Sequence, residues 1–157
     1  MKALFLSAFV LVFAATTCQV EASEDGVNLV NLGNVEGKSY FAGTSQMNWM
    51  IARDLCRNSG MELATITTQA QVDFLKSKYN STTFSGYYWI GARDSQSFRA
   101  LSWDSTDTEI ETLFGIKYRH FAAKYQICAA YYSGTDETVI DAYECTMNDV
   151  TGLICET

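Results

Sequence analysis

The run YYWIGA occupies residues 87–92, with Trp89 at its centre. Its residues are aromatic, β-branched or small, and none is charged, which favours a buried strand. Further strand-like runs follow at 101–103, 126–132, 139–145 and 153–156, and residues 38–44 form an earlier one. Residues 104–125 are polar and irregular, so we expect a long loop there.

Two helical patterns precede this run, over residues 48–59 and 69–79. In the first, apolar side chains recur at helical spacing and make one face. Asn48 suits its N-cap, and Gly60 suits the left-handed cap at its C-terminal end. The second begins with the T-x-x-Q spacing of a capping box at Thr68. Two helices followed by several short strands predict an α+β fold.

Length and composition indicate one folded domain. The chain has 157 residues, 48% of them hydrophobic and 13% aromatic, which argues against disorder. The formal net charge is -7. Such a charge repels phosphate backbones and anionic membrane surfaces, so we expect no nucleic-acid partner.

The N-terminus predicts export from the cell. Residues 1–22 have the form of a signal peptide, with a positive start, an apolar run over 3–15 and small residues before a cleavage point after Ala22. The apolar run is too short to span a bilayer, so we expect a secreted, extracellular protein without a membrane span. Residues 23–36 lack a clear period and predict a loose N-terminal arm, followed by a domain over 37–157.

The cysteines predict two disulfides. Cys18 is removed with the signal peptide, and four cysteines remain. An even number in an oxidising compartment predicts two bonds, and three pairings are compatible with that count. No cysteine is left over for a covalent dimer, so we expect a monomer or a non-covalent oligomer. The sequon at Asn80 predicts N-glycosylation.

No enzymatic chemistry is indicated. His120 is the only histidine, no thiol is left free to act as a nucleophile, and no metalloprotease, P-loop or Rossmann motif occurs. We therefore expect a binding protein and not an enzyme.

Several motifs resemble the C-type lectin family. The similarity rests on GMELATI at 60–66, WIGA at 89–92 and ICE at 154–156, with four cysteines in the family's order. It covers roughly residues 37–156, and the style is similar to short secreted lectins of insects. The resemblance implies a C-type-lectin-like domain, in which two helices pack on short antiparallel sheets with a long loop region. It also implies two disulfides, Cys56–Cys155 and Cys128–Cys145.

The family's calcium site is poorly matched here. The family supplies oxygen ligands from an E-P-N or Q-P-D tripeptide, an acidic residue beside the inner first cysteine, and a W-N-D run before the inner second one. The tripeptide window holds Tyr118, Arg119 and His120, and the chain has no proline. Gln126 replaces the acidic residue, and only Asp141 keeps an oxygen in the third window. Because calcium takes six to eight oxygen ligands, we expect no binding through this site.

Two acidic groups offer an alternative. One comprises Asp136, Glu137, Asp141 and Glu144, and the other comprises Asp104, Asp107, Glu109 and Glu111. Either could form a displaced Ca²⁺ site, with Asp141 and Glu137 as the first candidates, although solvated loop charge is the favoured interpretation.

The sequence therefore predicts a secreted binding protein that recognises an extracellular glycan or protein ligand without the usual calcium site. An innate immune role or a salivary effector role would fit. The alternative is a calcium-dependent carbohydrate-binding lectin with a degenerate or shifted site. The candidate ligand-binding residues are Tyr118, Arg119, His120, Gln126, Asp136, Glu137, Asp141 and Glu144. The tyrosine pairs at 87–88 and 131–132 lie on strands, so we expect one member of each pair to be exposed.

Overall fold

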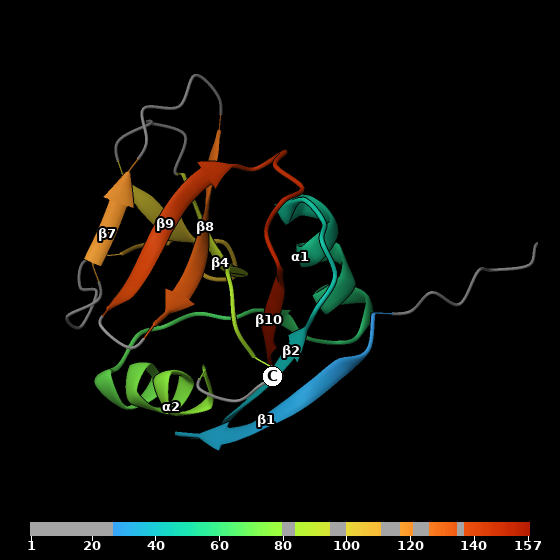
Figure 1. The fold of residues 1–157 in the computed structure, drawn as a ribbon, viewed down its shortest axis with the longest axis vertical. Helices are drawn as coiled ribbons and strands as arrows, with labels where there is room; N and C mark the ends of the chain where they lie inside the picture. The colour runs from blue at the N-terminus through green and yellow to red at the C-terminus, as the bar shows by residue number, and fades with distance from the viewer. Residues whose placement is uncertain (1–26, 80–83, 95–99, 111–116, 121–125, 135–136) are drawn as a thin grey trace, which may run out of the picture.

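The computed structural model describes residues 27–79, 84–94, 100–110, 117–120, 126–134 and 137–157. Within these residues the chain forms two helices and one ten-stranded sheet (Figure 1). The elements are β1 (Leu29–Val35), β2 (Lys38–Gly43), α1 (Trp49–Asn58), β3 (Glu62–Leu63), α2 (Gln69–Tyr79), β4 (Tyr88–Asp94), β5 (Leu101–Trp103), β6 (Thr108–Glu109), β7 (Lys117–His120), β8 (Ile127–Ser133), β9 (Thr138–Glu144) and β10 (Gly152–Glu156). The predicted α+β class is confirmed. The segment expected to be a signal peptide and the sequon at Asn80 lie outside the described residues.

The sheet joins the first and last strands of the chain. Its strand order is β1-β2-β10-β4-β8-β9-β7, with β3, β5 and β6 paired beside this path. The pairs β10–β4 and β7–β9 are parallel, and the remaining pairs are antiparallel. The C-terminal strand β10 therefore lies between β2 and β4 and connects the two halves of the sheet.

Helix α1 has the predicted caps. The Asn48 side chain accepts a hydrogen bond from the backbone N–H of Ile51 at 3.0 Å. At the other end Gly60 adopts a φ of 72°, and the N–H of Met61 donates to the carbonyl of Cys56 at 2.9 Å. This is a Schellman cap, which needs the left-handed residue that glycine supplies without strain.

Helix α2 has a modified form of the predicted capping box. The Thr68 hydroxyl accepts from the backbone N–H of Gln71 at 3.2 Å. The Gln71 side chain reaches back one residue further than a capping box requires and accepts from the N–H of Thr67 at 2.7 Å. Two backbone donors at the start of α2 are thereby satisfied.

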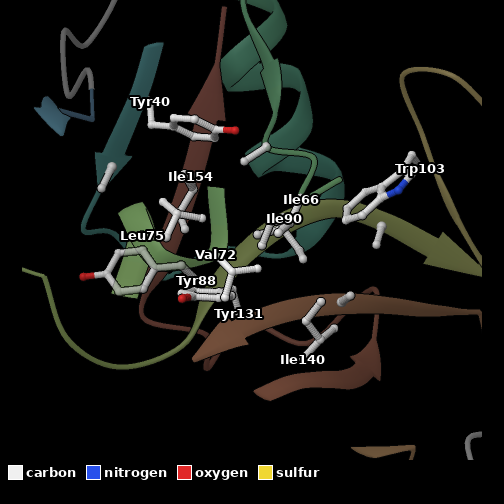
Figure 2. Close-up of a cluster of buried hydrophobic side chains, with 14 of the residues drawn as sticks. Tyr40, Ile66, Val72, Leu75, Tyr88, Ile90, Trp103, Tyr131, Ile140 and Ile154 are labelled. Carbon is white, nitrogen blue, oxygen red and sulfur yellow. The ribbon is translucent and has the colours of Figure 1, made fainter. Parts of the chain in front are cut away.

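The first part of the core lies between α2 and the sheet. Figure 2 shows Val72 and Leu75 of α2 near Tyr88 of β4 and Tyr131 of β8. Leu75, Tyr88 and Tyr131 are completely buried. The amphipathic face of α2 and the inner face of the sheet thus share one apolar cluster, which also contains Trp103.

The second part of the core surrounds the two disulfides. The indole N–H of Trp89 donates to the carbonyl of Met47 at 2.7 Å, and that of Trp49 donates to the carbonyl of Ile90 at 2.8 Å. Both disulfides, Cys56–Cys155 and Cys128–Cys145, are formed as the family resemblance implied. They connect α1 to β10 and the start of β8 to the end of β9.

The prediction of a loose arm over residues 23–36 was wrong for its second half. Residues 29–35 form β1, which pairs antiparallel with β2. A register shift between Asn31 and Gly33 inserts an extra residue, and the φ of Gly33 is 115°. This bulge interrupts the alternation of apolar and polar residues, so the strand has no visible period in the sequence.

The predicted long loop is also partly strand. Within residues 104–125, β6 pairs with β5, and β7 pairs with β9. Strand β6 has only two residues, and β7 has four. Strands this short carry too little periodicity to separate them from a polar loop.

No helix among the described residues is long and apolar enough to cross a membrane.

A partly buried ion pair joins β2 to the C-terminal strand β10. The Lys38 ammonium donates to Glu156 at 2.9 Å and to the Thr65 hydroxyl at 2.6 Å. Glu156 is 8% exposed and also accepts from the backbone N–H of Thr65 at 3.1 Å. It accepts from the Thr65 hydroxyl at 2.7 Å as well, so one cation and two further donors compensate the carboxylate, as a buried charge requires.

We therefore expect Lys38→Met to lower the free energy of unfolding by about 1–3 kcal/mol, because the Glu156 carboxylate would lose its cation. Urea unfolding at neutral pH measures the change. The control is Lys76→Met, at an exposed position of α2. A loss no larger than that of the control would contradict the assignment.

Candidate functional site

Three tyrosines gather on one face of the sheet. The register aligns Trp89 of β4 with Ala130 of β8, and Ala130 with Asp141 of β9. Since side chains two residues apart on a strand share a face, Tyr132 and Tyr143 lie on this same face. We name Tyr87, Tyr132 and Tyr143 the tyrosine cluster.

The rings of the tyrosine cluster are in contact. Tyr87 stacks on Tyr132 with ring centres 4.9 Å apart, and Tyr143 meets Tyr87 edge-on at 5.7 Å. All three side chains are half-buried, whereas Tyr88 and Tyr131 are fully buried. One ring of each tyrosine pair is therefore buried and the other is half-buried, so the outer rings are less exposed than expected. The partly exposed rings provide a rigid amphipathic surface of the kind found at binding interfaces.

Tyr143 has a polar contact beneath this surface. Its hydroxyl donates to a carboxylate oxygen of Asp141 at 3.3 Å, and Asp141 is only 1% exposed. Burial and the neighbouring Asp141 carboxylate raise the pKa of the Tyr143 phenol. Tyr143 therefore remains protonated, and a hydrogen-bond donor, throughout the physiological range.

The described candidates for ligand binding lie on or beside strands β7, β8 and β9. Tyr118, Arg119 and His120 lie on strand β7, in register with residues 140–142, and not on the loop where we expected them. Gln126 is exposed just before β8, and Glu144 ends β9 opposite Ile127. Gln126 and Glu144 thus lie near one another at the same end of the sheet. Asp136 lies outside the described residues.

Glu137 and Asp141 are separated along the chain. Glu137 comes just before β9, so extended chain places their Cα atoms about 13 Å apart. Calcium holds each of its oxygen ligands at about 2.3–2.6 Å. The two carboxylates therefore do not share one ion in this arrangement.

The acidic group in the former loop region is divided as well. The carboxylate of Asp104 accepts from Arg57 at 2.9 Å and also from Arg93, and its side chain is 7% exposed. Asp107 and Glu109 are exposed, and Glu111 lies outside the described residues. Within the described ranges, no three histidine, cysteine, aspartate or glutamate side chains gather as a metal site. Two arginines thus compensate the charge of Asp104, whereas a metal ion would compensate it in a displaced calcium site.

A family model for the C-type lectin domain matches residues 45–157. The chain belongs to the C-type lectin domain family. It is 28% identical over 94 residues to rat (Rattus norvegicus) C-type lectin domain family 2 member D5, a match that covers 59% of this chain and 37% of that protein. The chain thus spans little more than a third of this relative's length.

Two solved structures share the fold at low sequence identity. A complex of SPL-1 with GlcNAc superposes with a TM-score of 0.65 and 19% identity, covering 90% of this chain and 98% of that one. A calcium-independent type II antifreeze protein gives a TM-score of 0.59 and 20% identity, covering 83% and 95%. These similarities establish the fold alone.

Sequence reasoning missed Tyr143 as a surface residue. The signal was available, because Asp141 and Tyr143 are two residues apart in a strand-like run and so share a face. No local pattern could reveal that the ring of Tyr87, just before β4, stacks on that of Tyr132 in β8.

Substitution of Asp104 tests its structural role. We expect Asp104→Asn to lower the free energy of unfolding by about 1–2 kcal/mol, because two arginines lose a carboxylate partner. Chemical denaturation measures the change, and Glu109→Gln on exposed β6 is the matched control. Equal, negligible effects of both substitutions would disprove the role of Asp104.

Proposed function

We propose that this protein is a secreted C-type-lectin-like binding protein that recognises an extracellular glycan or protein ligand without the family's calcium site. The proposal rests on the burial of Asp141 and its contact with Tyr143. Asp141 is the one residue with an oxygen ligand in the W-N-D window. Its side chain is buried and accepts a hydrogen bond from the Tyr143 hydroxyl. The tripeptide window is part of β7.

The tyrosine cluster is the surface that we assign to ligand recognition. Tyrosine rings contact the apolar faces of sugars and protein side chains, and their hydroxyls supply hydrogen bonds. The stacked pair Tyr87 and Tyr132 loses little side-chain freedom on binding, because each ring already constrains the other. A preorganised aromatic surface needs no metal to hold its ligand.

Secretion, N-glycosylation at Asn80, and a role in innate immunity or as a salivary effector belong to the same proposal. They rest on the signal-like N-terminus, the sequon and the family. The lack of catalysis is likewise proposed, since binding is the general activity of C-type lectin domains.

The second candidate function is calcium-dependent carbohydrate binding through a shifted site. The proximity of Gln126 and Glu144 at one end of the sheet favours it, because both supply oxygen ligands. The GlcNAc complex of SPL-1 is a sugar-bound example with this fold.

A glycan array separates the two functions. The folded, disulfide-intact protein is applied in calcium buffer and again in EDTA. We expect any glycan signal to persist in EDTA, because the tyrosine cluster requires no ion. Signal that vanishes in EDTA would contradict the proposal and favour the shifted calcium site. If no glycan binds in either buffer, a protein ligand is captured from extracellular fluid under the same two conditions.

Substitution within the tyrosine cluster locates the surface. For the ligand found in this way, we expect Tyr132→Ala to weaken binding about tenfold or more, equivalent to roughly 1.4 kcal/mol. Titration calorimetry provides the dissociation constants, and Met50→Ala on the exposed side of α1 is the control. Unchanged affinity for a folded Tyr132→Ala protein would remove the cluster from the binding site.

A further inference from the structure

Helix α2 begins without a charge of its own. Its first turn contains no acidic residue, although a carboxylate at this end interacts favourably with the helix dipole. The nearest carboxylate to its cap comes from another element. The Thr68 hydroxyl donates to Glu36 at 2.5 Å while it accepts from the N–H of Gln71.

Glu36 is an unusual residue for its position. It forms the two-residue turn between β1 and β2 together with Gly37, and their φ angles are 50° and 82°. Such a turn favours Asn-Gly or Asp-Gly, because both central residues are left-handed. Glutamate adopts this conformation less readily, but its longer side chain reaches Thr68.

The hairpin also contacts α2 at Phe74. The ring of Phe74 lies so close to Gly33 that a Cβ atom at Gly33 would be 3.3 Å from it. Tyr40 of β2 meets Phe74 with ring centres 5.7 Å apart. Figure 1 shows the C-terminal end of β1 next to α2. The segment matched by the family model begins at residue 45, after this hairpin.

We infer that Glu36 is a positioning residue that supplies the N-terminal charge of α2 and couples the β1–β2 hairpin to that helix. Glutamate at position 36 reaches the start of α2, although asparagine or aspartate would suit the turn better. The contact of Glu36 with Thr68 thus joins the β1–β2 turn to the first turn of α2. This inference is independent of the proposed ligand recognition.

Native-state hydrogen exchange of the full disulfide-bonded protein tests the coupling. The variant Glu36→Asn improves the turn but removes the side chain that reaches Thr68. We expect the amides of Gln71 and Val72 to exchange roughly three- to tenfold faster, while the amides of the turn exchange at the same rate or more slowly. Glu36→Gln keeps an acceptor without the charge and should give a smaller effect. Glu109→Gln is the control.

Two results would overturn the inference. In the first, Gln71 and Val72 retain their exchange rates in Glu36→Asn, so the carboxylate has no influence on the helix. In the second, all slowly exchanging amides accelerate equally, so the substitution only destabilises the whole fold.

Discussion

The Cys56–Cys155 bond holds α1 against β10, the strand that joins the two halves of the sheet. β10 pairs with β2 on one side and with β3 and β4 on the other. The bond closes a sequence separation of 99 residues, and on the chain-entropy model such a loop is worth up to about 4–5 kcal/mol. Trp49 and Trp89 then connect α1 to the sheet through hydrogen bonds in opposite directions. The position of β4, and hence of Tyr87, depends on this arrangement.

The tyrosine cluster is a consequence of how these strands are ordered. β8 pairs with both β4 and β9, so residues distant in sequence share one face. Ala130 separates Trp89 from Asp141 on that face, and its small side chain leaves the larger rings to meet around it. Beneath them Asp141 is buried against Tyr143. This face of the fold presents aromatic side chains and a buried carboxylate.

Prediction from sequence succeeded where the controlling interactions are local. The caps of α1 and the burial of Trp89 follow from residues within a few positions of each other. It failed at β1, where the bulge at Gly33 removes the period, and at β7, which is recognisable only through its pairing with β9. The charge of Asp104 is compensated by Arg57, which lies 47 residues away in the sequence. Charge compensation over such separations has no local signature, so acidic residues alone could not distinguish a metal site from an ion pair.

Calorimetric unfolding in calcium and in EDTA tests calcium independence most directly. Extracellular calcium modules have dissociation constants of about 0.1–1 mM, so ~10 mM calcium would occupy such a site. An occupied site stabilises the folded state by about 2.7 kcal/mol when the ion is at 100 times its dissociation constant. We expect the same Tm in both buffers. A Tm several degrees higher in calcium would contradict the account and restore a metal site to this domain.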